Sequence, residues 1–162
     1  MIGNLIKGLG GLLYVQIWKK RIRVTDAGSR KRSEEMPLIA IESDAKGQRV
    51  VAVGQRARGL RGPHIREINP FDHPRVAFED FAAAEKLLRA LFEKNRSGKF
   101  TLFAPRVIIH PMEKFEGGLT DIEKQALKEL ALSAGAREAV VCEGAELSMN
   151  GVDFEALKRK GD

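Results

Sequence analysis

Residues 100–142 decide the fold, and they read FTLFAPRVIIHPMEKFEGGLTDIEKQALKELALSAGAREAVVC. Phe100–Ile109 is expected to be a strand, and the β-branched run at its end indicates burial on both faces. Thr120–Glu123 has the pattern of a capping box, which begins a helix. Gly135 is placed to end that helix in the left-handed conformation, and Ala139–Cys142 follows as a short buried strand. The stretch therefore predicts a strand–helix–strand unit within one sheet.

Apolar residues recur at the three- and four-residue spacing of amphipathic helices in three segments. A helix over Phe78–Asn95 is followed by Ser97 and Gly98, which end it. A shorter helix is expected over Val152–Lys160. The capped helix has one predicted apolar stripe, formed by Leu119, Ile122, Ala126, Leu127, Leu130 and Ala134.

The N-terminal third of the chain is rich in short strand patterns. Leu12–Trp18 is mostly apolar and Arg21–Thr25 alternates basic and β-branched residues, so together they predict a hairpin that turns at Lys19 and Lys20. Gly28–Glu35 is a polar loop by composition. The segments that follow are two more strands and a short helix, over Leu38–Glu42, Arg49–Val53 and Gln55–Leu60. The four strands predict a meander.

Antiparallel strands followed by strand–helix–strand units imply an α/β fold, with a mixed sheet and helices on its faces. The chain has 162 residues, of which 43% are hydrophobic, and this suits one domain with its own core. We expect three parts: a flexible or amphipathic N-terminal segment over residues 1–9, the folded domain over 10–150 and a helical tail over 151–162.

Cysteine content and hydropathy bear on the compartment. Cys142 is the only cysteine, which excludes a disulfide framework and favours a reducing, intracellular compartment. No apolar run reaches the roughly 18 residues of a membrane-spanning helix. The apolar start of the chain is interrupted by Lys7 and by glycines and has no cleavage site, so it does not match a signal peptide. We expect a soluble, cytoplasmic protein.

The formal net charge of +6 is unevenly distributed. Residues 1–66 hold fourteen Lys and Arg against five Asp and Glu, whereas residues 67–162 hold fourteen against seventeen. The densest basic segment, residues 19–32, is either a solvated strand face with its loop or a docking surface for an anionic partner. Nucleic acid is the less favoured partner, because Trp18 is the one aromatic residue beside the segment. The basic residues of this segment are Lys19, Lys20, Arg21, Arg23, Arg30, Lys31 and Arg32.

Residue types that commonly carry catalysis are scattered along the chain. His64, His73 and His110 have no carboxylate or cysteine at metal-ligand spacing, so no metal site is expected. Gly8–Gly11 is glycine-rich but matches neither a dinucleotide-binding nor a phosphate-loop motif. The sequence therefore predicts no cofactor.

Three collinear stretches resemble the MreB family of bacterial actin-like proteins. They are VVAVGQRARGLRG at 50–62, IREINPFDHPRVAFEDFAAAEKLL at 65–88, and the segment 102–143 with LFAPRVIIHP, IEKQAL and AGAREAVVCE. The resemblance covers about residues 10–150. It implies the first subdomain of the actin fold, a mixed five-stranded sheet of ribonuclease H type, and a role related to cell shape.

The resemblance also implies that parts needed for ATP hydrolysis are missing. The family's first phosphate hairpin carries an Asp-x-Gly-Thr motif, which we place at Leu5–Leu13, and no Asp or Glu precedes Asp26 to serve magnesium. The other half of the nucleotide cleft belongs to a second subdomain. Glu123 matches the glutamate that orients the attacking water in the family, but it is also the capping partner of Thr120. We expect no catalysis; the alternative is half of a two-chain ATPase completed by a partner.

Membrane contacts are a further feature that the resemblance implies. Leu102 and Phe103 match the Leu-Phe pair of a loop that inserts into the cytoplasmic face of the membrane; alternatively, they begin the next strand and enter the core. In the N-terminal segment, one face of a short amphipathic helix would carry Ile2, Leu5, Ile6 and Leu9, or these residues form a disordered or strand-leading tail. We expect a non-catalytic module that binds the membrane surface or a protein of the shape-determining machinery. A folded product without a remaining function is a third possibility.

Overall fold

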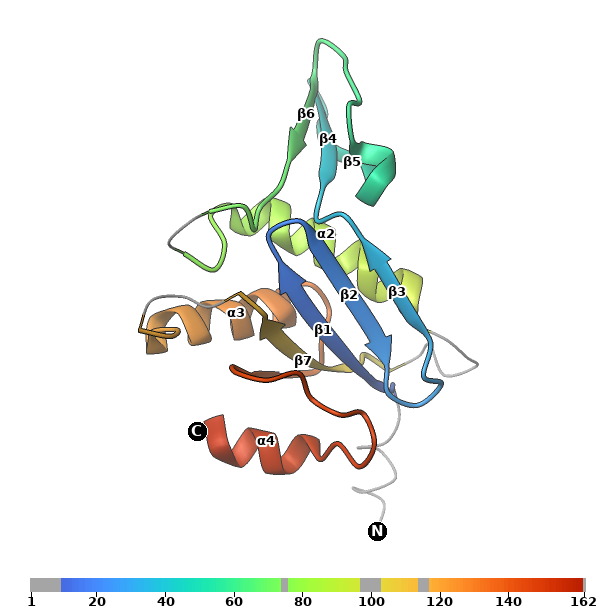
Figure 1. Cartoon of the computed structure of the whole chain (residues 1–162). Helices are drawn as coiled ribbons and strands as arrows, with labels where there is room; N and C mark the ends of the chain where they lie inside the picture. Colours follow the sequence, from blue (N-terminus) through green and yellow to red (C-terminus); the bar gives the residue numbers. More distant parts are fainter. Residues whose placement is uncertain (1–9, 74–75, 97–102, 114–116, 162) are drawn as a thin grey trace.

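Strand β1 (Leu12–Trp18) lies in the middle of a five-stranded sheet (Figure 1). The computed structural model describes residues 10–73, 76–96, 103–113 and 117–161. The strand order is β3-β2-β1-β7-β8; β1 pairs antiparallel with β2 and parallel with β7, and β8 is parallel to β7. The predicted mixed five-stranded sheet and α/β class are confirmed. The other strands are β2 (Arg21–Asp26), β3 (Arg32–Glu35), β7 (Arg106–Pro111) and β8 (Glu138–Val141).

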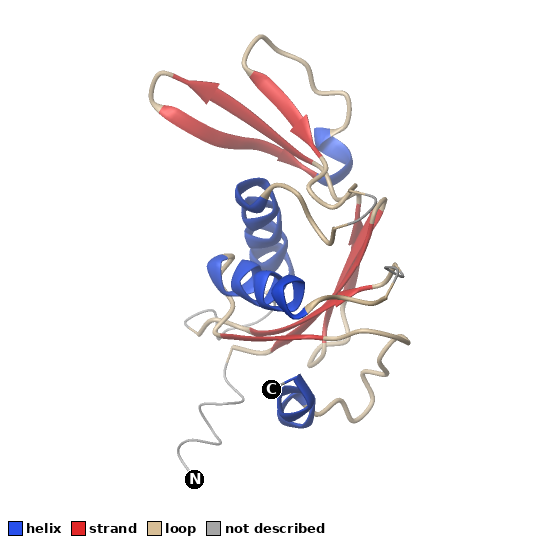
Figure 2. Cartoon of the chain, turned by 90° about the vertical axis from the view of Figure 1, so that its left-hand side faces the viewer, coloured by secondary structure: helices blue, strands red, loops and turns tan. Residues whose placement is uncertain are grey.

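The sheet buries apolar side chains on both of its faces because strand residues alternate in direction. On the inner face, Leu13 and Val107 pack with the helices α2 (Phe81–Asn95) and α3 (Asp121–Ser133). On the outer face, Tyr14 and Ile108 belong to a second cluster that includes Phe154 of α4 (Phe154–Gly161). Figure 2 shows α2 and α3 on one side of the sheet and α4 on the other.

The two long helices begin at side-chain caps. Asp80 accepts a hydrogen bond from the Ala83 N–H at 2.9 Å, so α2 begins at Phe81, three residues after the expected start at Phe78. At α3 the predicted capping box is present, with Thr120 and Glu123 accepting each other's backbone N–H. Gly135 follows α3 with a φ of +117°, a conformation that favours glycine.

A second, three-stranded antiparallel sheet projects from the first (Figure 1). The expectation of one meander is therefore wrong, because only the first hairpin continues into the five-stranded sheet. One face of the small sheet has its own apolar cluster of Leu38, Ala40 and Ala57, whereas Ile39 and Ile41 of its central strand join the main core. The expected short helix is a 3-10 turn, and β6 was not predicted. The elements are β4 (Ile39–Asp44), β5 (Gly47–Val53), η1 (Gly54–Ala57) and β6 (Ile65–Ile68).

Two strand boundaries differ from the sequence prediction. The last four residues of the expected polar loop form β3, an edge strand whose side chains are exposed or half-buried and therefore show no apolar pattern. Strand β7 begins at Arg106 and not at the expected Phe100. The Arg106 N–H donates to the Gly11 carbonyl at 3.0 Å, at the start of the pairing with β1. Residue Phe103 therefore lies before the strand.

Two residues of the predicted apolar stripe of α3 lie outside the core. Ile122 is 82% exposed and Ala126 is half-buried. The buried part of the stripe consists of Leu119, Leu127, Leu130 and Ala134.

Truncation of core residues tests this architecture. Ile108→Ala on the outer face and Leu127→Ala on the inner face, both at 0% exposure, should each lower the free energy of unfolding by about 2–5 kcal/mol. Ile122→Ala is the matched control and should change it by less than about 0.5 kcal/mol, since its side chain is already in water. Urea unfolding measures all three values. Equal losses at Ile122 and Leu127 would contradict the assigned packing of α3.

Candidate interaction surface

The seven basic residues of the segment 19–32 do not form one surface. Lys19 and Lys20 make the turn between β1 and β2, whereas Arg30 and Lys31 lie in the turn between β2 and β3. Strand β2 separates the two turns by about 20 Å, at about 3.3 Å per residue. The two groups therefore lie at opposite ends of the sheet.

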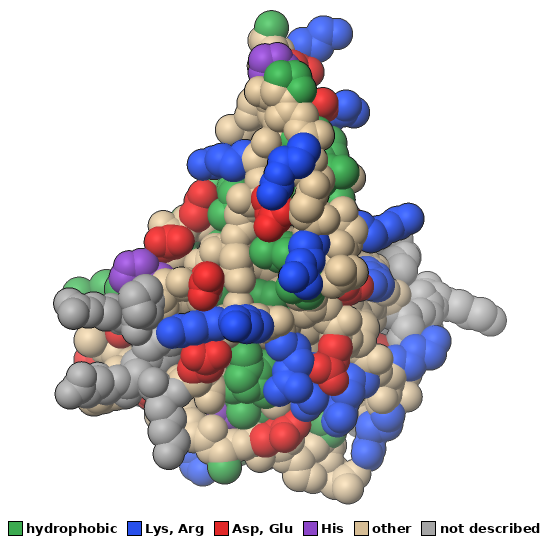
Figure 3. Space-filling model, turned by 45° about the horizontal axis from the view of Figure 1, so that its top comes forward, with side chains coloured by type: hydrophobic (Ala, Val, Ile, Leu, Met, Phe, Trp, Pro, Cys, Tyr) green, Lys and Arg blue, Asp and Glu red, His purple; other side chains and the backbone are tan. Residues whose placement is uncertain are grey.

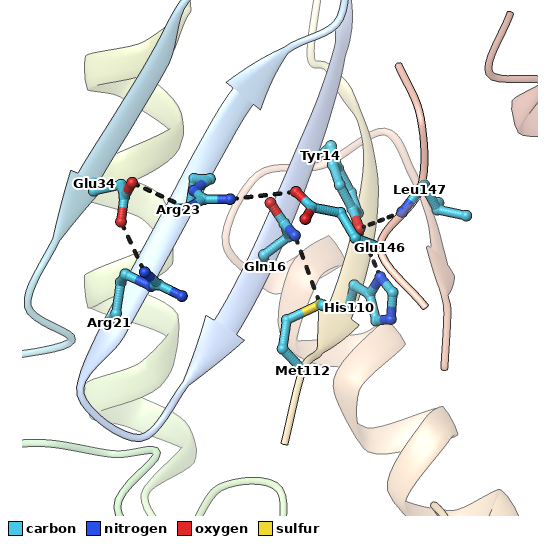
Figure 4. Close-up of polar contacts among 9 residues, drawn as sticks. All are labelled: Tyr14, Gln16, Arg21, Arg23, Glu34, His110, Met112, Glu146 and Leu147. Atoms are coloured by element: carbon cyan, nitrogen blue, oxygen red, sulfur yellow. Dashed lines mark hydrogen bonds and ion pairs between the residues drawn. The ribbon is translucent and has the colours of Figure 1, made fainter. Parts of the chain in front are cut away.

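Arg21 and Arg23 lie on the outer face between these ends and are already paired (Figure 4). Arg23 contacts Glu34 at 3.1 Å and Glu146 at 3.2 Å, and its side chain is only 13% exposed. Arg21 contacts Glu34 at 3.5 Å, and its guanidinium lies 4.0 Å from the centre of the Trp18 ring. Figure 3 shows such acidic side chains interleaved with Lys and Arg. These two arginines are partly neutralised and are weak candidates for a partner's charge.

The turn between β2 and β3 is held by hydrogen bonds and presents three exposed cations. The Asp26 carboxylate accepts the N–H of Gly28 at 2.8 Å and of Ser29 at 3.2 Å, and Arg30 has a left-handed φ of +63°. Arg30, Lys31 and the neighbouring Arg32 are exposed. Within the described residues, none of these three cations makes an ion pair.

Phe103 lies at the same end of the sheet. Its carbonyl accepts a hydrogen bond from Arg96 Nη2, after the end of α2, at 2.6 Å, and a Cβ on Gly10 would clash with it at 2.9 Å. The β2–β3 turn reaches the same place, because the Ala27 N–H donates to the Leu12 carbonyl at 2.9 Å. We call this group the basic end: Arg30, Lys31, Arg32 and Phe103.

The Phe103 side chain is 37% exposed. The alternative that it enters the core within a strand is therefore wrong. Its predicted partner Leu102 lies outside the described residues. So do the N-terminal candidates Ile2, Leu5, Ile6 and Leu9.

Glu123 is engaged by its own helix. Its Oε2 atom accepts from the Thr120 N–H and from the Thr120 hydroxyl, both at 2.9 Å. Within the described residues, the first turn between strands lies at Lys19 and Lys20. Placing the family's first phosphate hairpin at Leu5–Leu13 is therefore wrong, because Leu12 and Leu13 belong to β1. Among the described residues, no group of three His, Cys, Asp or Glu could hold a metal ion. None of the helices in the described ranges has the length and apolar character needed to cross a bilayer.

A buried polar chain on the outer face was missed by the sequence reasoning (Figure 4). The Tyr14 hydroxyl lies 2.7 Å from His110 Nδ1, His110 Nε2 lies 3.1 Å from the Gly144 carbonyl, and the Leu147 N–H donates to the Tyr14 oxygen at 3.1 Å. One consistent assignment has the tyrosine donating to Nδ1 and Nε2–H donating to Gly144. These contacts attach the segment after β8 to strands β1 and β7 on the outer face of the sheet.

Burial changes the pKa of both ring groups. It raises the pKa of Tyr14, and it lowers the pKa of His110 below 6.5 because the charged imidazolium is poorly solvated there. The only sequence signal for this contact was the alternation within β1 and within β7, which places the two side chains on the same face of the sheet, 96 positions apart in the sequence.

The family model described as MreB/Mbl protein matches residues 22–162. The cell shape-determining protein MreB of Haemophilus influenzae is 33% identical over 115 residues, which cover 68% of this chain and 31% of that protein. MreB of Escherichia coli strain K12 is 33% identical over 115 residues, covering 67% of this chain and 31% of its own length.

Solved structures with the same fold are MreB5 of Spiroplasma citri bound to ADP, with a TM-score of 0.62 and 21% identity, and a non-polymerising MamK mutant bound to AMPPNP, with a TM-score of 0.61 and 15% identity. Each alignment covers 82% of this chain, and 37% and 40% of the respective structures. The actin-like fold is therefore shown, and the chain spans about a third of the length of the curated relatives.

The His110 contact predicts a pH dependence of stability. The folded protein holds His110 neutral below pH 6.5, whereas the unfolded chain takes up a proton as the pH falls through 6.5. The stabilisation is therefore complete above pH 6.5 and is lost below it, with a slope of at most about 1.4 kcal/mol per pH unit for one proton. Urea unfolding between pH 7.5 and 5.5 should show this slope, and His110→Gln, which keeps a donor and an acceptor, should flatten it. Identical slopes would refute the assignment.

Proposed function

The chain belongs to the MreB/Mbl family, and we propose that it acts in cell-shape determination as an actin-like module that docks on the anionic cytoplasmic face of the membrane. The curated relatives are cell shape-determining proteins. Because this chain corresponds to about a third of their length, we propose a docking role for it and not the activity of the whole relative.

The basic end supports this proposal. Three exposed cations without ion pairs among the described residues lie at the same end of the sheet as a partly exposed phenylalanine. Each basic residue near an anionic bilayer contributes about 1 kcal/mol, which salt screens. Full insertion of a phenylalanine adds about 1.5–3 kcal/mol, and the apolar contact depends little on salt. Charge and insertion together favour a weak, reversible membrane contact.

We also propose that the chain does not hydrolyse ATP. Its β1–β2 turn carries two lysines and no carboxylate, so a magnesium ligand is missing from that turn. Glu123 is held by the cap of α3 and has no metal-binding cluster beside it within the described residues. Phosphoryl transfer depends on positioned charges, and neither the β1–β2 turn nor the capped Glu123 offers a ligand for magnesium.

Vesicle sedimentation tests the docking proposal. At low salt the chain should bind vesicles with an anionic lipid and release at high salt, because the charge contribution is screened. Phe103→Glu should weaken binding at least tenfold, since it removes the insertion and adds a repelled charge. Replacing Arg30, Lys31 and Arg32 by glutamine should reduce binding to a similar extent.

Two matched controls make the result specific. Phe81→Glu changes a phenylalanine of similar exposure, 39%, at the other end of α2 and should leave binding unchanged. Lys19→Gln with Lys20→Gln removes two cations from the opposite end of the sheet and should have less than a threefold effect. Equal losses in the controls and the test variants would show that only net charge matters, and no sedimentation at low salt would exclude membrane docking.

Isothermal titration calorimetry tests the absence of catalysis. Titration of ATP with magnesium should give no saturable heat, and no phosphate should be released. Glu123→Ala should lower the free energy of unfolding by about 1 kcal/mol through the lost cap, without changing any turnover. Micromolar ATP binding would favour the two-chain ATPase instead.

A further inference from the structure

Strand β8 is an edge of the five-stranded sheet, and among the described strands it pairs with β7 alone. The Arg137 N–H donates to the Pro105 carbonyl at 2.8 Å, so Arg137 directs its peptide group toward β7. Because peptide groups alternate along a parallel strand, Glu138 and Val140 direct theirs to the free edge. An unpaired strand edge is a template for an added strand.

A groove of about 770 Å³ at this edge is lined by residues of β8, α3 and α4. The two helices lie on opposite sides of the sheet (Figure 2). The apolar part of the groove comes from half-buried Val141, Leu147 and Leu157. A strand added here would direct alternate side chains toward α3 and toward α4. The strand is four residues long, so the groove accommodates about four residues of an extended partner, at about 3.3 Å each.

The rim of the groove is positively charged on both sides. Lys124 is paired with Glu143 at 3.0 Å and Lys158 with Glu138 at 2.7 Å. Lys128 of α3 and Lys160 of α4 border the groove and make no ion pair within the described part of the chain. Asp121 also borders the groove, at the start of α3, where the helix dipole favours a negative charge.

We propose that this groove binds an extended acidic segment of a partner protein, which pairs with β8 as a sixth strand. Backbone hydrogen bonds to Val140 supply the attachment, and β-branched residues fill the apolar part. Acidic residues at the two ends of the segment meet Lys128 and Lys160. A second copy of this chain is the poorer occupant, because a two-fold axis through β8 would bring the same lysines together.

The probe is a fluorescein-labelled peptide with the sequence Glu-Glu-Val-Ile-Val-Glu-Glu, blocked at its C-terminus. Fluorescence anisotropy should show saturable binding to the intact chain, and amide exchange at Val140 should slow. N-methylation of alternate peptide residues in the strand-facing register should abolish binding, whereas methylation in the other register should be tolerated. Lys128→Glu with Lys160→Glu should weaken binding at least tenfold.

Controls separate strand addition from charge attraction and from membrane docking. Lys46→Glu with Arg58→Glu changes the charge equally on the exposed small-sheet region and should leave binding unchanged. Equal loss in that variant, indifference to both N-methylation registers, or no saturation at millimolar peptide would each overturn the proposal. Concentration-dependent dimers that protect Val140 without peptide would assign the groove to a second copy and also overturn it. Lipid is absent from the assay, so its outcome is independent of vesicle binding.

Discussion

The parallel pairing of β1 with β7 is the contact on which the rest of the structure depends. Six residue pairs join strands that are separated by more than eighty residues of chain. Each strand is apolar on both faces, so the pair supplies one core under α2 and α3 and another under α4. A shift of this register by one residue would move the side chains of each cluster to the opposite face of the sheet, so both clusters depend on it.

The register also explains how the basic end is assembled. Parallel strands begin at the same end of a sheet, so the residues before β7 lie near the start of β1. The β2–β3 turn returns to the same end because β2 is antiparallel to β1. Topology therefore brings Phe103 to the same end of the sheet as Arg30, Lys31 and Arg32, although some seventy residues separate them in the chain. The same topology places Lys19 and Lys20 at the opposite end of the sheet.

Local signals in the sequence predicted the elements with strong periodicity or caps. The capping box at Thr120 and the β-branched run of β7 fall where the structure has them, because each depends on residues within a few positions. Strand β3 was missed because both its faces lie near water, and its pairing with β2 uses backbone atoms that composition does not report. The small sheet was missed because four short strand patterns do not say which strands share a core. The Tyr14–His110 contact and the pairing of Arg23 with Glu146 join distant segments, so only the three-dimensional structure reveals them.

The most direct test of the account is whether the basic end, and not the opposite end, enters the bilayer. An environment-sensitive fluorophore can be attached to a single cysteine at Phe103→Cys or at Lys20→Cys, each in a Cys142→Ala background. Upon addition of acidic vesicles, the fluorophore at position 103 should shift to shorter wavelength and gain intensity, as expected in an apolar medium, while the fluorophore at position 20 should remain unchanged. A shift at position 20 alone, at both positions, or at neither would contradict the account.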